Sequence, residues 1–249
     1  MRIGGIVDMS TVDWYGNVSL IVFFSGCNFR CHYCQNSGLI PLDSGEEVEI
    51  DLIRDRIQIG RKLLDAVVFT GGEPLLQPKA LMEAGELVKS YGLKLMLDTN
   101  GSVPSSLEPL LKAYLVDRVA LDVKAPLTPE DYEGVAGLRG NGKRVVEGIK
   151  KTINLCEKHG VTIEARTTIA PTISDENEFV RRIASDIINH CDVYYLQQYD
   201  NTGQVLSPEI KALEPPSRDR MIELAKIAIQ EGVKNVYIKT RKDGLERVE

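Results

Sequence analysis

The chain has no long apolar run, no excess of basic charge and few cysteines, and each shortage excludes a class of protein. No stretch of its 249 residues approaches the ~20 consecutive apolar residues that a membrane-spanning helix needs. The N-terminus lacks a basic region followed by a long apolar core, so it does not resemble a secretory signal. The formal net charge of −6 argues against a nucleic-acid-binding surface, because neutralising phosphates requires a basic face. We therefore expect a cytoplasmic protein that binds neither membranes nor nucleic acid.

Cysteine is scarce outside one short segment. The chain has five cysteines, and Cys27, Cys31 and Cys34 lie together, separated by three and then two residues. Five cysteines with three of them clustered indicate a protein of a reducing compartment, not one held together by disulfides. Cys156 falls in a helical pattern and Cys191 just before a strand-like run, where single cysteines usually behave as small buried hydrophobes.

The three clustered cysteines directly follow an apolar run, Val18 to Phe24, that predicts a buried strand. Soft thiolates favour zinc, copper(I) or an iron–sulfur cluster. Structural zinc and ordinary clusters take four protein ligands. Three cysteines would instead hold a four-iron cluster by three corners and leave the fourth iron open to a substrate or cofactor. The alternative is a zinc loop completed by His32 or another residue.

Strand and helix patterns alternate along the chain. An N-terminal strand or hairpin within 1–17 precedes strand-like runs at 18–24, 66–70, 93–97, 117–123, 161–169 and 193–197, with a last short strand at 235–239. Helical patterns lie between them. The first begins after a turn at 43–47 and runs through Leu63 and Leu64, and the others lie at 78–91, from about 104, and at 143–159, 175–189 and 217–230.

Six strand–helix units with right-handed parallel crossovers predict an α/β fold. No low-complexity linker divides them. We expect one domain over 1–249, with its core at about 17–200 and a C-terminal helix and strand in 201–249. Trp14, the only tryptophan, is expected to pack at the end of the barrel.

Polar residues gather where the predicted strands end. Parallel α/β barrels carry their functional residues at this C-terminal edge, so we expect the groups to converge with the cysteines. Plain structural roles are the alternatives: an ordinary turn for the glycine pair, and an ion pair with Glu164 for Arg166. The groups are Gly71-Gly72-Glu73-Pro74, Asp98-Thr99-Asn100-Gly101, Asp122 with Lys124, Arg166, and Gln198-Tyr199.

The Cys-x-x-x-Cys-x-x-Cys spacing, with Tyr33 before the last cysteine, resembles the signature of the radical S-adenosylmethionine (SAM) enzymes. The resemblance implies a partial (β/α)6 TIM-like barrel with short N-terminal and C-terminal additions. It also implies a catalytic [4Fe–4S] cluster on Cys27, Cys31 and Cys34. SAM would bind the open iron and be cleaved reductively to methionine and a 5′-deoxyadenosyl radical.

The pair Asp122 and Lys124, with Asp98-Thr99-Asn100-Gly101 one strand earlier, resembles the glycyl-radical activating enzymes, and above all the anaerobic ribonucleotide reductase activating proteins. In such enzymes this aspartate and lysine hold SAM, and the earlier aspartate, here Asp98, contributes to the ribose side or to a monovalent cation. Arg166 would hold the SAM carboxylate or the partner protein.

The resemblance implies further cofactor-binding residues. Gly71, Gly72 and Glu73 would bind the SAM amino group. Tyr33 would lie near the adenine, with packing of the loop as its alternative. Gln35, Asn100 and Tyr199 complete the implied set.

Two segments depart from the activating enzyme of pyruvate formate-lyase, and they bear on the identity of the partner. Leu196-Gln197-Gln198-Tyr199 stands where that enzyme has a histidine after its sixth strand, and Asp13-Trp14-Tyr15-Gly16 replaces its Asp-Gly-Pro-Gly segment. The implied partner is a large glycyl-radical enzyme such as an anaerobic ribonucleotide reductase, with flavodoxin or ferredoxin as electron donor. A small-molecule, peptide or nucleoside substrate is the main alternative, and a non-enzymatic zinc or iron–sulfur module is the remote one.

Overall fold

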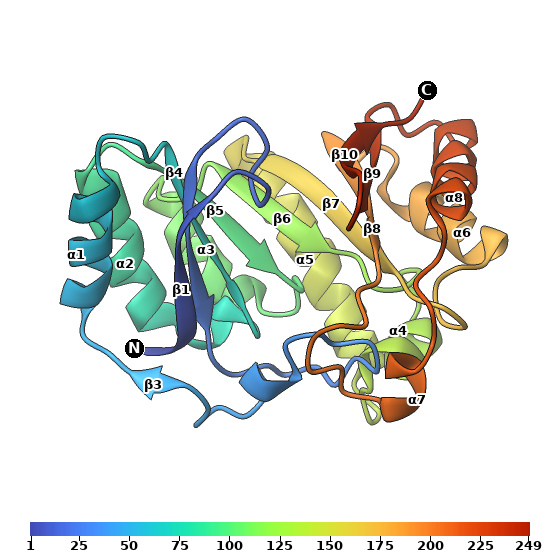
Figure 1. Cartoon of the computed structure of the whole chain (residues 1–249), viewed down its shortest axis with the longest axis horizontal. Helices are drawn as coiled ribbons and strands as arrows, with labels where there is room; N and C mark the ends of the chain where they lie inside the picture. The colour runs from blue at the N-terminus through green and yellow to red at the C-terminus, as the bar shows by residue number, and fades with distance from the viewer.

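The computed structural model describes residues 1–249, and one ten-stranded sheet contains every strand. Its central strands are parallel, and each lies beside the parallel strand that precedes it in the chain (Figure 1). This order arises when every crossover returns with the same hand. The parallel strands are β2 (Ser19–Phe24), β4 (Ala66–Gly71), β5 (Lys94–Thr99), β6 (Arg118–Asp122), β7 (Thr162–Ile169), β8 (Val193–Gln198) and β9 (Val236–Thr240).

The two edges of the sheet do not meet, so the barrel is open. At one edge β1 (Arg2–Ser10) pairs antiparallel with β2, and β3 (Glu46–Glu47) pairs with β1. At the other edge β10 (Gly244–Arg247) pairs antiparallel with β9. The strand order runs from β10 to β3 without closing. The α/β class and the partial barrel are thus confirmed. Residues 1–17 contain the predicted strand, but no hairpin, since β1 pairs with β2.

Helices connect the parallel strands and pack on the outer face of the sheet (Figure 1). The main ones are α1 (Ile50–Gly60), α2 (Pro78–Ser90), α3 (Pro104–Lys112), α5 (Gly142–His159), α6 (Asn177–Ile187) and α8 (Arg218–Gln230). Short helices fill the loops: α4 (Pro129–Ala136), α7 (Pro208–Lys211), and the 3₁₀ turns η1 (Ser37–Leu39) and η2 (Pro74–Leu76).

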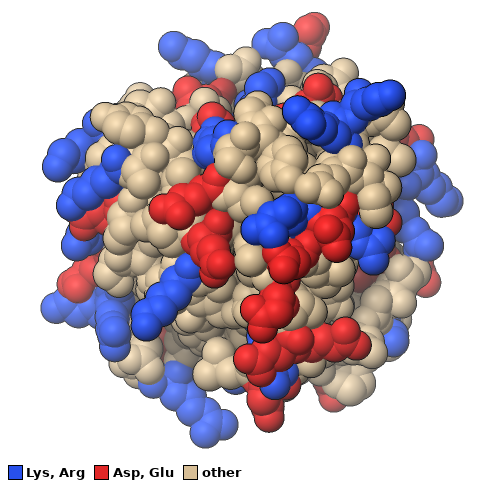
Figure 2. Space-filling model, turned by 90° about the vertical axis from the view of Figure 1, so that its left-hand side faces the viewer, with Lys and Arg blue, Asp and Glu red and all other residues tan.

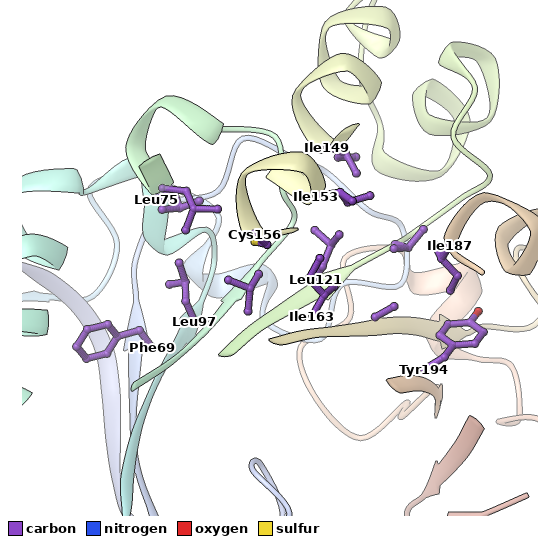
Figure 3. Close-up of a cluster of buried hydrophobic side chains, with 14 of the residues drawn as sticks. Phe69, Leu75, Leu97, Leu121, Ile149, Ile153, Cys156, Ile163, Ile187 and Tyr194 are labelled. Atoms are coloured by element: carbon purple, nitrogen blue, oxygen red, sulfur yellow. The ribbon is translucent and has the colours of Figure 1, made fainter. Parts of the chain in front are cut away.

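The outer core forms because α5 carries apolar residues at helical spacing. Figure 3 shows Ile149, Ile153 and Cys156 of this helix against the buried strand residues Leu121 and Ile163. Cys156 is fully buried, as expected of a small hydrophobe, and Cys191 is half-buried. The packing fixes the strand ends, and these carry the polar residues.

The inner face of the sheet has a smaller apolar layer at the start of the strands. Trp14 is 5% exposed and packs with Ile21, Ala66, Val68, Met96 and Ala120. The Arg118 guanidinium lies 5.5 Å from the centre of the Trp14 ring, close enough for a cation–π interaction. Trp14 therefore closes one end of the barrel interior, as predicted, and leaves the other end for polar groups.

Two local predictions were wrong, and three short elements were missed. Glu46 and Glu47 form strand β3 instead of starting a helix, and the helix begins only at Ile50. It ends at Gly60, so Leu63 and Leu64 lie beyond it. The short helices α4 and α7 and strand β10 were not predicted, because segments of four to eight residues give too few turns or alternations for a periodic pattern.

The surface mixes both signs of charge. On the face that carries α1 and α2, acidic side chains gather near the centre and lower right, with basic side chains scattered around them (Figure 2). No helix is both long and apolar enough to span a bilayer.

Candidate active site

The cysteine loop, residues 25–36, leaves β2 at the C-terminal edge of the sheet. Cys31 is buried, and Cys27 and Cys34 are half-buried. Burial raises the pKa of Cys27 to about 11 and of Cys31 to about 12, and it also raises the pKa of Cys34. The thiols are therefore protonated at neutral pH, and metal binding releases their protons.

The three thiols line a cavity of about 350 Å³ enclosed by the ends of the parallel strands. That volume falls in the ~300–1,000 Å³ range of small-molecule sites. Most of the residues predicted from the sequence meet here. They are Cys27, Cys31, Cys34, Tyr33, Gln35, Gly71, Gly72, Asp98, Asn100, Asp122, Lys124 and Arg166. Glu73 and Tyr199 are not in the cavity wall.

The glycine turn after β4 presses directly against the cysteine loop. A Cβ on Gly72 would lie 2.2 Å from the carbonyl oxygen of Gly26, and Gly71 has a φ of +123°. Both positions therefore require glycine. The backbone N–H of Glu73 donates to the same Gly26 oxygen at 2.7 Å. This contact fixes the start of the cysteine loop and leaves the two glycines facing the cavity.

The Glu73 carboxylate is fully buried and bonded to the protein. Its Oε1 accepts from Leu75 N at 3.1 Å and from Thr99 Oγ1 at 2.8 Å, and its Oε2 accepts from Asn100 N at 2.7 Å. Burial outweighs these bonds and raises the pKa of Glu73 to about 7. The side chain thus joins the loop after β4 to the loop after β5.

Asn100 extends this connection to the cysteine loop. Its Nδ2 donates to Asn28 Oδ1 at 3.0 Å, and its Oδ1 accepts from the backbone N–H and hydroxyl of Ser102. Asn28 in turn donates to Ser102 Oγ at 2.8 Å. Three loops are thereby held in one network beside the thiols.

Asp122 and Lys124 form an ion pair in the opposite wall. Lys124 Nζ lies 3.0 Å from Asp122 Oδ2, and the Lys124 side chain is 16% exposed. Burial lowers the pKa of Lys124, but the negative charges that face it, Asp122 first, raise it well above its usual value overall. Lys124 therefore presents a permanent positive charge to the cavity.

Arg166 is paired twice inside the barrel. Its Nε lies 2.6 Å from Glu164 Oε1, which is the alternative predicted for it, and its Nη1 lies 3.1 Å from Asp98 Oδ2. Nη2 donates to the carbonyl of Asp13 at 3.2 Å. Burial raises the pKa of Asp98 to about 6, against the opposing charge of Arg166. The guanidinium thus links β7, β5 and the loop before β2.

The donor set fits a three-cysteine cluster with its cofactor. Tyr33 is 4% exposed, and its hydroxyl has no hydrogen-bond partner although the residue lines the cavity. Nowhere do three side chains of Cys, His, Asp or Glu come close enough together to bind a single metal ion. A cubane cluster takes one thiolate per iron and does not need the thiols to meet at a point. His32, the suggested fourth zinc ligand, is exposed and outside the cavity wall.

Tyr199 supports a segment that covers the outside of the cysteine loop. Its hydroxyl donates to Ile210 O at 3.2 Å. The backbone N–H groups of Leu206 and Ser207 donate to the carbonyls of Cys34 and His32 at 3.1 and 3.0 Å. Figure 1 shows this C-terminal segment lying along the cysteine loop, a contact that no local sequence signal predicts.

Sequence reasoning missed several residues of the cavity wall. Asp13, Asn36, Thr70, Thr168 and Gln197 all line it. Strand alternation gave a usable signal for Thr168, since it lies on the same face of β7 as Arg166. Asp13 has no such signal, because it reaches the cavity from the loop before β2.

Comparison with known proteins places the chain in a family. Residues 21–183 match the model of the radical SAM superfamily. A relative in Methanocaldococcus jannaschii, described as a candidate glycyl-radical enzyme activating enzyme, is 36% identical over 239 residues, which are 96% of this chain and 95% of the relative. The pyruvate formate-lyase-activating enzyme of Clostridium pasteurianum is 33% identical over 192 residues, 76% of each chain.

Solved structures share the fold at low identity. A radical SAM methyltransferase from Sphaerobacter thermophilus gives a TM-score of 0.72 at 15% identity, over 91% of this chain and 67% of the other. A domain of a pyruvate-formate lyase-activating enzyme from Bacteroides vulgatus gives 0.54 at 17% identity, over 70% and 99%. The family match over most of the chain agrees with the site geometry: the chain belongs to the radical SAM superfamily, whose members use a [4Fe–4S] cluster and SAM.

Proposed function

We propose that this radical SAM enzyme installs a glycyl radical on a large partner enzyme. The observation that carries the proposal is the similarity to an activating-enzyme relative over nearly the whole length of both chains. The site supports it, because three thiols share a cavity with a polar wall. When bound and reduced, the cluster supplies the electron that splits SAM into methionine and a 5′-deoxyadenosyl radical, which removes a hydrogen atom from a glycine α-carbon.

The residues of the chain divide into holders of the cluster and holders of SAM. Cys27, Cys31 and Cys34 bind the cluster. The backbone of Gly71 and Gly72, which lines the cavity beside the cysteine loop, receives the SAM amino group.

The remaining wall groups serve the other parts of SAM. Lys124 pairs with the SAM carboxylate as a point charge, and Asp122 accepts from the ribose hydroxyls. Tyr33 lies beside the adenine, and Gln35 also faces the cofactor. Asp98 serves the ribose side or a monovalent cation.

Three predicted cofactor residues take a different role in the proposal. The polar groups of Glu73, Asn100 and Tyr199 already form hydrogen bonds within the protein. We assign them to positioning the loops that contact the cofactor. Arg166 lies in the cavity wall but is already paired with Asp98 and Glu164, so we assign it to holding Asp98 in place.

The partner and the setting follow from the same proposal. The partner is a glycyl-radical enzyme, with an anaerobic ribonucleotide reductase as the first candidate, and the reductant is a flavodoxin or a ferredoxin. The chain works as one cytoplasmic domain, in keeping with the single sheet that contains all its strands.

The test is anaerobic reconstitution with iron and sulfide, followed by SAM, dithionite and each glycyl-radical enzyme encoded in the source genome. We expect an electron paramagnetic resonance (EPR) doublet of a glycyl radical on one of them, and none with the Cys31→Ala variant. A wild type that cleaves SAM but gives no glycyl radical on any of these enzymes would refute the proposal. It would favour the second reading, a small-molecule, peptide or nucleoside substrate.

A further inference from the structure

Two polar side chains in the cavity wall have no assigned role. Thr168 lies on β7 and Gln197 on β8, and the sheet pairs them directly. Both are half-buried and both line the cavity. Neither side chain makes a hydrogen bond within the chain, so both are available to a ligand.

The neighbours of Gln197 show that this freedom is specific to the cavity face. Gln198 points the other way, donates to Pro216 O at 2.7 Å and accepts from Arg241 N at 2.9 Å. On β7, Thr167 donates to Val123 O at 2.8 Å and accepts from the Tyr194 hydroxyl. Gln198 and Thr167 are therefore satisfied by the protein, whereas Gln197 and Thr168 are not.

Thr168 and Gln197 lie across the barrel from the cysteine loop. That loop follows β2, and β4, β5 and β6 separate β2 from β7 and β8 in the sheet. The wall assigned to SAM belongs to β2, β4, β5 and β6 together with their loops. Thr168 and Gln197 thus border the part of the cavity on the β7–β8 side, away from the wall assigned to SAM.

The chemistry of the pair selects a neutral ligand. A carboxamide presents a donor and an acceptor at once, which complements a peptide group, and a hydroxyl can do either. The cavity wall beside them holds no unpaired cation: Arg166 is paired with Asp98 and Glu164. Lys239, opposite Gln197 on β9, lies outside the wall and donates to Val12 O at 2.8 Å. A phosphate or carboxylate would find no charged partner here.

We propose that Thr168 and Gln197 form a subsite for the peptide main chain around the target glycine. The inference rests on the proposed function and deepens it. Glycine has no side chain to cover its peptide groups, so these two side chains can reach the N–H and C=O next to the α-carbon. They hold the segment in place and leave SAM to the opposite wall.

The test uses Thr168→Val and Gln197→Met, which preserve shape and break no internal hydrogen bond. We expect each to raise the apparent KM for the partner enzyme about tenfold, and the pair about 100-fold, as for hydrogen bonds lost at a binding site. Glycyl-radical yield is measured by EPR against partner concentration, and 5′-deoxyadenosine formed without partner is measured in parallel. The matched control is Gln198→Met, which should lower thermal stability but leave the apparent KM unchanged.

Each other outcome is decisive. An unchanged apparent KM in the double variant overturns the inference while the proposed function stands. A parallel fall in SAM affinity, or in 5′-deoxyadenosine formed without partner, assigns the two residues to the cofactor and also overturns it. If the wild-type protein forms a glycyl radical on none of the glycyl-radical enzymes, the proposed function is wrong, and so is the subsite.

Discussion

Glu73 offers a sharp test, because the family resemblance and the structure assign it different work. The resemblance gives its carboxylate to the SAM amino group. The structure buries the side chain completely and bonds both oxygens to the protein, through Leu75 N, Thr99 Oγ1 and Asn100 N. If the structural role is correct, removing the carboxylate destabilises the protein even without cluster or SAM.

The structure also sets the size of the effect. Glu73→Ala leaves three buried donors without a partner, at about 1–3 kcal/mol each before relaxation, so we expect a loss of about 3–5 kcal/mol. Glu73→Gln keeps one oxygen, but its amide nitrogen faces a donor, the backbone N–H of Asn100. We expect it to lose about 1–3 kcal/mol.

The pH dependence has a definite sign. Burial raises the pKa of Glu73 from its usual 4.5 to about 7. A raised folded-state pKa gives stability that is present below about 4.5 and is lost as the pH rises through about 7. The advantage of wild type over Glu73→Gln should therefore shrink between pH 5 and pH 8. Burial also raises the pKa of Asp98 to about 6. Asp98 therefore adds the same loss of stability with rising pH to wild type and to Glu73→Gln.

Urea unfolding of the cluster-free proteins at several pH values measures both effects. The matched control is Glu83→Ala, an exposed carboxylate on α2 that should change the unfolding free energy by less than about 0.5 kcal/mol. If Glu73→Ala unfolds at the wild-type urea concentration and only SAM affinity falls, Glu73 is a cofactor ligand and the positioning role is wrong.

Four further substitutions test other parts of the site. Asp122→Ala and Lys124→Ala should each weaken SAM binding about tenfold or more, measured by calorimetry, and leave the iron content unchanged. The reason is that losing one member of a charged pair costs at least about 1.4 kcal/mol. Loss of iron would mean that the cofactor wall is misplaced. Gly72→Ala sets a Cβ 2.2 Å from Gly26 O, so thermal unfolding should show a loss of about 1–3 kcal/mol, and a wild-type melting curve would contradict that contact. Tyr199→Phe removes the bond to Ile210 O and should cost about 1 kcal/mol with SAM affinity unchanged; a weaker affinity would return Tyr199 to the cofactor.

The sequence predicted the strand ends well, because each apolar run fills the buried face of one strand. Asp98 and Asp122 lie at the ends of β5 and β6 and Arg166 lies within β7, and a parallel sheet brings the C-terminal halves of such strands to one edge. That these three residues meet at the cavity therefore followed from the strand order.

The partners of each side chain did not follow from the pattern. Glu73 finds its donors on the next loop, and Tyr199 meets a segment that doubles back along the cysteine loop. Such contacts depend on loop paths that have no periodicity. Gln197 and Gln198 are identical residues in sequence, and only their opposite faces on β8 separate a cavity residue from a scaffold residue.

One measurement tests the central claim most directly: the 5′-deoxyadenosine released by the reconstituted, dithionite-reduced protein when SAM is added under anaerobic conditions. The account predicts 5′-deoxyadenosine and methionine in equal amounts, an EPR spectrum of the reduced cluster that changes on adding SAM, and no product from Cys31→Ala. A metal centre coordinated entirely by the protein, with a spectrum indifferent to SAM and no 5′-deoxyadenosine, would contradict it.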